Sequence, residues 1–254
     1  MVMKDLNINK LKHVLVGYIN MITVFLVTFG HLDSRKIKLM RLGSNYGGWW
    51  VPKELTMHSY VNPYLVSIGL GHDVSFDFEC LKLGMNLVGL DPLSSSVRYA
   101  EKELSSFPNK TLIQSGIWIT CGYVKFFQPR NIGHDSWSIT NSQLTDSIGA
   151  RSFKVMTLDD IVKKVPLIAN SDFIILKIDI EGAEYEILKN QDFTVLKADF
   201  LAVEFDYLSL IKFKSFGKRI VRAWQVRRLL VKLKKIDGFQ LIKIENFNFF
   251  LIKM

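Results

Sequence analysis

Cysteine is scarce in this chain, which has only two among its 254 residues, Cys80 and Cys121. Two cysteines form neither a disulfide framework nor a cysteine-based zinc cluster, and they do not indicate a compartment. The chain also lacks internal repeats and low-complexity segments, while 48% of its residues are apolar. This composition is typical of one α/β domain that buries a full core.

Alanine is absent before Ala100, which bears on an apolar segment near the amino terminus. Residues 14–30 contain no charge, and basic residues flank them on both sides. At about 1.5 Å per residue, a helix of this length is near the lower limit for crossing a bilayer. Without a small-residue cleavage site, a removed signal peptide is disfavoured. The sequence predicts a membrane anchor at 14–30 in a tail of residues 1–36; the alternative is a helix packed on a cytoplasmic domain.

A glycine-rich turn follows the first predicted strand, residues 64–68. Gly69 and Gly71 let the backbone turn tightly and approach a ligand closely, and Asp73 follows them. The next predicted strand ends at Asp91, 22 positions after Gly69. In nucleotide-binding βαβ units, an acid at about this spacing holds the ribose hydroxyls. The combination predicts a site for an adenosine-containing ligand.

The third glycine of the dinucleotide fingerprint is missing, because Val74 occupies its position. That glycine allows close packing of helix and strand around a pyrophosphate. Its absence disfavours an NAD-binding oxidoreductase, which stays open as an alternative. An adenosine ligand without a pyrophosphate is favoured, and S-adenosylmethionine is the obvious candidate.

Charged side chains crowd the end of a strand predicted at Phe173–Leu176. Lys177, Asp179, Glu181 and Glu184 follow within eight residues. In an open α/β sheet, ligands bind at the carboxyl ends of the strands. The sequence therefore predicts that Asp179 and Glu181 orient an acceptor or take its proton, and that Lys177 joins them in catalysis or neutralises their charge.

The order of these motifs resembles the FkbM-type family of S-adenosylmethionine-dependent methyltransferases. The family's glycine loop, acid-Pro pair and Lys-x-Asp-x-Glu-Gly-x-Glu segment match Gly69–Asp73, Asp91–Pro92 and Lys177–Glu184. The Asp-Gly-Gly-Tyr element of one branch is only partly matched, because Tyr46 replaces the aspartate and Trp49 the tyrosine. The resemblance implies methyl transfer from S-adenosylmethionine. The departure at Tyr46 leaves a catalytically inactive, membrane-associated scaffold open.

Strand and helix patterns alternate along the rest of the chain. Residues 200–205 predict a further buried strand, and residues 239–244 and 247–252 predict a terminal hairpin. We therefore predict an α/β methyltransferase domain at 37–254, with a doubly wound, mostly parallel sheet and a C-terminal antiparallel hairpin. The resemblance, which spans residues 39–254, implies the same Rossmann-like methyltransferase fold.

Residues 130–150 show no clear period and are predicted to form a loop. Long loops in compact domains are usually lids or disordered segments. His134 and Asp135 in this loop are candidates for an acid or a base. A solvated loop without a chemical role is an equal alternative.

Acidic residues are missing from residues 212–235, which hold ten basic side chains. The net charge of the whole chain is +9, so its positive excess lies in this segment. The apolar spacing predicts a basic amphipathic helix. An anionic membrane surface is the partner we expect for it, and a helix that only covers the sheet is the alternative. Nucleic acid is disfavoured because no recognition motif accompanies the charge.

We therefore expect an S-adenosylmethionine-dependent methyltransferase that acts on a hydroxyl oxygen of a glycan, a lipid or a small metabolite. The residues predicted to bind the cofactor are Gly69, Gly71, Asp73, Asp91 and Asp179. The motifs require no metal. Carboxylates nevertheless suit magnesium and manganese, and the residues that leave this alternative open are Asp179, Glu181 and Glu204.

Overall fold

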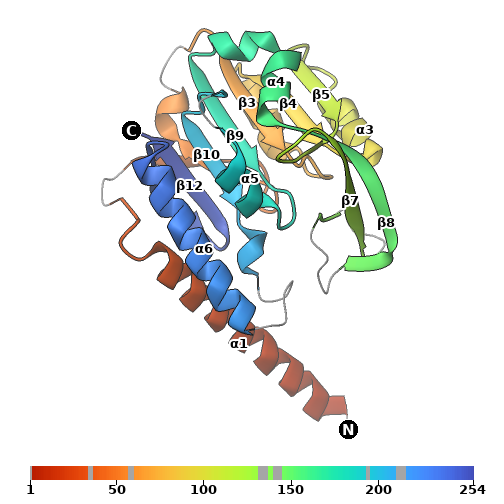
Figure 1. The fold of residues 1–254 in the computed structure, drawn as a ribbon, viewed down its shortest axis with the longest axis vertical. Coiled ribbons are helices and arrows are strands. Elements are labelled where there is room, and N and C mark those ends of the chain that lie inside the picture. Colours follow the sequence, from red (N-terminus) through yellow and green to blue (C-terminus); the bar gives the residue numbers. More distant parts are fainter. Residues whose placement is uncertain are drawn as a thin grey trace.

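The computed structural model has a seven-stranded sheet at its centre, with helices packed on both faces (Figure 1). The structure describes the backbone of residues 2–33, 37–56, 60–130, 137–139, 145–192, 195–209 and 216–254, and the side chains of these ranges from residue 14 onward, except residues 55, 56, 145–148, 216 and 218. In spatial order, the strands are β11 (Phe239–Glu245), β12 (Asn248–Lys253), β10 (Phe200–Glu204), β9 (Phe173–Ile178), β3 (Pro63–Ile68), β4 (Asn86–Asp91) and β5 (Lys110–Gln114).

The sheet is parallel from β10 to β5, and the hairpin β11–β12 adds two antiparallel strands beside β10. Every residue of the neighbouring strands β3 and β9 is buried, as expected where helices cover both faces. The predicted doubly wound α/β fold with a C-terminal antiparallel hairpin is confirmed. The carboxyl ends of all five parallel strands lie at one edge of the sheet, and the candidate site lies at that edge.

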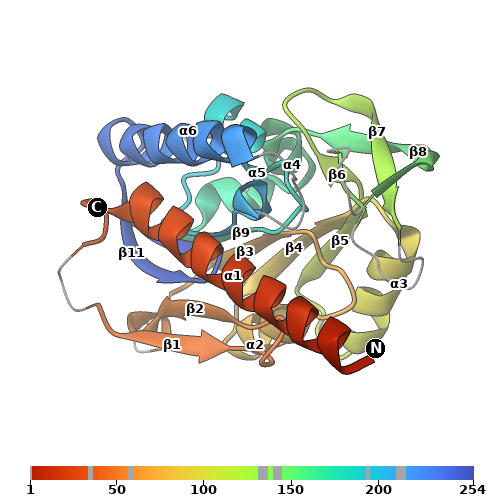
Figure 2. The same ribbon diagram turned by 90° about the horizontal axis from the view of Figure 1, so that it is seen from below.

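Two layers of helices cover the sheet, and Figure 2 shows them on opposite sides of it. One layer contains α4 (Leu158–Lys164), α5 (Glu184–Asn190) and α6 (Phe216–Lys235). The other contains α2 (Ser75–Lys82), α3 (Ser94–Glu103) and the two-stranded sheet β1 (Leu39–Leu42) and β2 (Trp49–Pro52). Short 3-10 helices complete the chain: η1 (Lys53–Thr56), η2 (Pro166–Asn170) and η3 (Asp206–Leu208).

A small sheet stands beside the main one and is formed by β6 (Gly116–Ile117), β7 (Gly122–Pro129) and β8 (Thr145–Met156). The prediction of a loop through residue 150 is wrong for residues 145–150, which belong to β8. Pairing with β7 forms this strand even though its own sequence shows no clear alternation. The candidates His134 and Asp135 lie outside the described residues.

Helix α1 (Val2–Thr28) contains most of the segment predicted as a membrane anchor, residues 14–30. Among the helices of the described ranges, none is long and apolar enough to cross a membrane, so the structure does not support the anchor. The helix packs on α6 instead, where Arg219 and Arg227 donate hydrogen bonds of 3.1 and 2.8 Å to backbone carbonyls of this segment. The alternative of a helix packed on the domain is what the structure shows.

Candidate active site

A pocket of about 460 Å³ opens at the carboxyl edge of the sheet. The ends of β3, β4, β9 and β10 line it, together with the turn of the C-terminal hairpin and the small side sheet. This volume lies within the range of small-molecule sites. The pocket brings together the residues predicted to bind the cofactor or to act in catalysis at the strand ends, which are Gly69, Gly71, Asp73, Asp91, Lys177, Asp179 and Glu181.

The glycine loop follows β3 and lies against the end of β9. Gly69 has a φ of +86°, and a Cβ built on it would lie 1.8 Å from the carbonyl oxygen of Asp179. The backbone N–H of Asp179 donates to Ile68 at 2.9 Å, and that of Gly69 donates to Leu90 at 2.9 Å. Because no side chain fits here, glycine is required for the loop to join the ends of three strands.

Asp91 ends β4 with its carboxylate turned toward the glycine loop. One oxygen accepts hydrogen bonds from the backbone N–H groups of Leu70 at 3.2 Å and Gly71 at 3.1 Å. The other accepts from Leu93 at 2.8 Å. Asp91 therefore fixes the loop as well as lining the pocket.

Lys177 is 4% exposed and reaches under the pocket floor. Its Nζ donates to the carbonyl oxygen of Gly69 at 2.6 Å and lies 3.8 Å from Oδ2 of Asp179. The same ammonium sits 5.6 Å from the ring centre of Trp49, within cation–π range. These contacts favour the alternative that Lys177 neutralises and positions its neighbours.

Asp77, on the first turn of α2, is a buried carboxyl that the sequence reading did not single out. Burial raises the pKa of Asp77, and the positive charge of Lys177 opposes this rise. Its helical position gave no signal, because an acid in the first turn of a helix is usually exposed and favoured by the dipole. Lys177 thus interacts with the buried carboxyl of Asp77 as well as with Asp179 in the pocket.

Asp73 binds the segment that precedes β2. Its carboxylate accepts hydrogen bonds from the Ser44 hydroxyl at 2.6 Å, the Gly47 N–H at 3.1 Å and the Ser75 N–H at 3.0 Å. Burial alone would raise the pKa of Asp73, but the hydrogen bonds from Ser44, Ser75 and Gly47 outweigh it and lower the pKa. Asp73 lines the pocket, and these contacts also hold the loop that carries Tyr46 in place.

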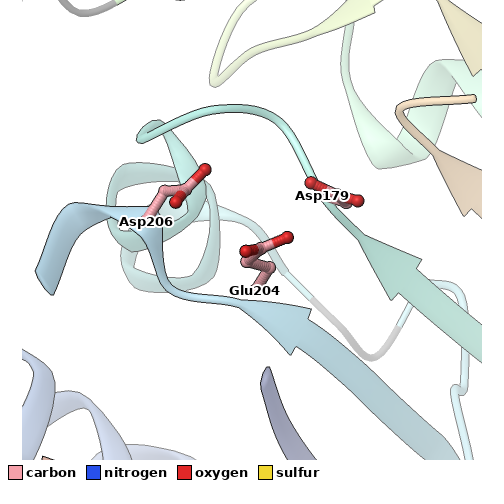
Figure 3. A group of neighbouring side chains, drawn as sticks. All are labelled: Asp179, Glu204 and Asp206. Carbon is pink, nitrogen blue, oxygen red and sulfur yellow. The ribbon is translucent and has the colours of Figure 1, made fainter. Parts of the chain in front are cut away.

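Three carboxyl groups meet on the β9–β10 side of the pocket (Figure 3). Asp179 follows β9, Glu204 ends β10, and Asp206 begins η3; each offers an oxygen, and these oxygens lie within 4.8 Å of one another. Such a group suits a proton acceptor for a hydroxyl substrate, and carboxylate oxygens also suit magnesium or manganese. In the metal-ligand alternative, Asp206 is therefore the third carboxylate, in place of the predicted Glu181.

Glu181 lies in the turn between β9 and α5, with the unusual φ of +61°. Its backbone carbonyl accepts a hydrogen bond from the Ser138 hydroxyl at 2.5 Å. The buried Glu184 braces the same turn, because its Oε1 accepts from the backbone N–H of Gly182 at 2.6 Å. A non-glycine residue in this backbone region is rare and costs free energy, and such positions cluster at functional sites.

Most of the other pocket residues come from segments whose sequence patterns predicted no functional site. Asn246, with a φ of +55°, and Asn248 approach from the hairpin turn. Phe126 and Trp137 approach from the side sheet and its neighbourhood. Asp206 alone had a signal, since it follows a predicted strand just as Asp91 and Asp179 do. The others are close to the site only because the hairpin and the side sheet pack at this edge.

Solved structures with a similar arrangement are distant from this chain. One is a “putative caffeoyl-CoA O-methyltransferase” from Staphylococcus aureus, with 10% identity, a TM-score of 0.42 and coverage of 79% of each chain. Another is a TehB-like SAM-dependent methyltransferase from Corynebacterium glutamicum, with 11% identity, a TM-score of 0.33 and coverage of 75% of this chain and 80% of that one. None of the curated proteins compared with the chain matches it significantly.

A family comparison matches a much larger part of the chain than any single motif does. The model described as the methyltransferase FkbM domain matches residues 52–233. This range includes the glycine loop, Asp91, the Lys177–Glu184 segment, and the acids Glu204 and Asp206. It begins after Tyr46 and Trp49, where the sequence departs from one branch of the resemblance. The chain belongs to the FkbM methyltransferase family.

Proposed function

We propose that the chain transfers a methyl group from S-adenosylmethionine to a hydroxyl oxygen of a glycan, a lipid or a small metabolite. The observation that carries this proposal is a cluster of three carboxyl groups beside the glycine loop in one pocket: Asp179, Glu204 and Asp206. A hydroxyl acceptor must lose its proton as its oxygen forms the new bond. Carboxylates at the reacting end of the site are suited to receive it.

The cofactor half of the proposal rests on the residues at the ends of β3 and β4. Asp91 offers carboxylate oxygens to the two ribose hydroxyls, and its position is fixed by the backbone N–H groups of the loop. Val74 is 4% exposed and packs in the core, so the helix start has no glycine at which a pyrophosphate would approach. These features fit an adenosine ligand without a pyrophosphate and disfavour NAD.

The chemical half of the proposal rests on Asp179. Bound S-adenosylmethionine supplies an electrophilic methyl group for an in-line displacement. Asp179 lies beside the glycine loop, because the two backbones contact each other, so its carboxylate is near both the cofactor site and the acids of β10. It orients the acceptor hydroxyl and takes its proton, while Lys177 holds the loop through Gly69.

Calorimetric titration and an isotope-labelled transfer assay test this proposal. We expect saturable binding of S-adenosylmethionine and no saturable binding of NAD. Protein incubated with methyl-labelled cofactor and pools of glycans, lipids or small hydroxyl compounds should then label one class of acceptor at oxygen. Tight NAD binding would support the oxidoreductase alternative. Cofactor binding without transfer to any acceptor would support the inactive scaffold, in which Tyr46 replaces the expected aspartate.

A further inference from the structure

Most of the large apolar side chains described on helix α1 lie on the face turned away from the domain. Eight large side chains of this helix and of the turn that follows it are between 49% and 64% exposed. At about 100° per residue they fall on one stripe, roughly 140° wide. We call these residues the α1 stripe: Val14, Leu15, Tyr18, Met21, Ile22, Phe25, Leu26 and Phe29.

The opposite face of α1 packs on the protein and mixes apolar with polar side chains, since Val27 is 1% exposed and belongs to the main core. Thr23 and Thr28 are buried there, and each hydroxyl donates to a carbonyl one turn earlier at 2.8 Å. The side chain of Asn20 accepts a hydrogen bond of 2.8 Å from Arg219 of α6. A helix that only covered a core would place its apolar stripe inward. On α1 the wider apolar stripe faces outward, which indicates that something outside the domain covers it.

The neighbouring helix α6 also exposes apolar side chains over its first turns, and it adds positive charge. Ile220, Val221 and Trp224 are more than half exposed, whereas the opposite face of α6 is buried in the core. Arg228 follows on the exposed face, with its guanidinium 4.6 Å from the ring centre of Trp224. Lys234 and Lys235, at the end of the helix, are also exposed.

We propose that the α1 stripe and the exposed face of α6 dock on an anionic lipid surface, lying in its headgroup region. A wide apolar stripe with aromatic side chains beside a cationic helix is the combination that binds such surfaces. Residues 212–235 hold no acid, and the exposed cations Arg228, Lys234 and Lys235 complement phosphatidylserine or phosphoinositide headgroups. A second copy of the chain would bring two such cationic helices together, which disfavours it as the occupant.

The docking surface is next to the pocket, although the proposal does not depend on methyl transfer. Helix η3, which carries Asp206, contacts both α1 and α6. Tyr207 of η3 strengthens the contact with α6, because its hydroxyl donates to Gln225 at 2.8 Å and its ring lies 4.9 Å from the Arg222 guanidinium. Figure 1 shows the amino-terminal half of α1 projecting beyond the body of the domain, toward the edge where the parallel strands end.

Vesicle sedimentation of the full-length chain tests the docking. We expect it to sediment with vesicles of phosphatidylcholine and phosphatidylserine, weakly with phosphatidylcholine alone, and less as salt is raised. The triple variant Ile22→Ser, Phe25→Ser, Phe29→Ser should lose about tenfold or more in affinity for both vesicles. The triple variant Arg228→Glu, Lys234→Glu, Lys235→Glu should lose about tenfold or more for the phosphatidylserine vesicles only.

The matched control is Val61→Ser with Leu167→Ser, because these side chains are 92% and 63% exposed but lie near the amino ends of β3 and β9. It should bind vesicles like the parent chain. Thermal melting checks that each variant is folded, and the charge variant tests the proposal independently if the serine variant unfolds. A parent chain that stays in the supernatant, or serine and charge variants that sediment like it, would overturn the proposal. So would a dimer, seen by analytical ultracentrifugation, that binds no vesicles and that the serine variant dissociates.

Discussion

The two halves of the pocket hold their carboxylates in different ways. On the β3–β4 half, Asp73 and Asp91 accept hydrogen bonds from backbone N–H groups at 2.8–3.2 Å. On the β9–β10 half, Asp179, Glu204 and Asp206 face one another, with oxygens within 4.8 Å. The first arrangement is typical of acids that shape a loop, because each N–H bond stabilises the carboxylate. The second places like charges close together, which opposes folding and is expected where chemistry needs them.

The halves meet at one point, where Gly69 touches the Asp179 backbone and Lys177 bonds to the Gly69 carbonyl. Mutations can therefore change turnover without changing cofactor affinity only if this contact between Gly69, Lys177 and Asp179 stays intact. Substitutions on the β9–β10 half should change turnover, those on the β3–β4 half should change cofactor affinity or stability, and those at the contact point should change both.

The largest effect should come from Asp179→Asn, which keeps the shape of the side chain and removes its ability to take a proton. General-base contributions are about 10²–10⁴-fold, so turnover with an identified acceptor should fall by that factor. Cofactor affinity, measured by calorimetry, should stay within about threefold, because affinity belongs to the other half.

Glu181→Gln is the control for Asp179→Asn, since Glu181 lines the same pocket but is outside the group of three acids. It should retain most of the turnover. If Asp179→Asn keeps normal turnover while Glu181→Gln loses it, the assignment of the base is wrong. If Asp179→Asn fails to fold, Asp179 is a structural partner of Lys177.

Gly69→Ala should destabilise the contact between the halves. Its Cβ would clash with the Asp179 carbonyl at 1.8 Å, and its φ of +86° adds backbone strain. Overpacking and strain together cost about 2–5 kcal/mol, which lowers Tm by roughly 5–15 °C in a chain of this size. Gly84→Ala separates the two causes, because Gly84 also has a φ of +86° but its Cβ would meet nothing within 4 Å. Equal losses in Tm for both variants would show that the contact with Asp179 contributes nothing.

Asp91→Asn should weaken S-adenosylmethionine binding while leaving the pocket folded. Asparagine keeps one oxygen for the loop N–H groups but loses the charge that the ribose hydroxyls would meet. A hydrogen bond to a charged group contributes about 1.5–3 kcal/mol, so affinity should fall roughly tenfold or more by calorimetry. Turnover at saturating cofactor should change far less. Unchanged affinity in the folded variant would contradict the assignment of Asp91 to the cofactor.

The sequence predicted the acids and glycines of the β3–β4 half and part of the β9–β10 half. The predicted residues and the missed ones are placed by different physical causes. Gly69, Asp91 and Asp179 are placed by the ends of buried strands, and those strands have strong local patterns. Asp77 and Asn248 are placed by packing between segments far apart in the chain, which no local pattern records. The apolar run at 14–30 predicted a membrane anchor because composition does not reveal that Arg219 and Arg227 of α6 bond to this helix and that Val27 packs in the core.

The smallest effect concerns Asp73, whose pKa is lowered by its hydrogen bonds to Ser44, Ser75 and Gly47 despite its burial. A carboxyl whose pKa is lower in the folded state stabilises the fold above its unfolded pKa of about 3.9 and loses this contribution as pH falls through the folded pKa. Asp73→Asn weakens these hydrogen bonds, so it should lower the free energy of unfolding by about 1 kcal/mol near pH 7, the size of one net hydrogen bond, and lower Tm by roughly 2–4 °C. The asparagine does not titrate, so this position adds no pH dependence to the stability of the variant. The difference from the parent chain should shrink progressively below about pH 4.

Ser44→Ala should show a smaller difference in the same pH window, because it removes only one of the donors. A difference between Asp73→Asn and the parent chain that is constant from pH 7 to pH 3 would mean that shape, rather than charge, holds the loop that carries Tyr46.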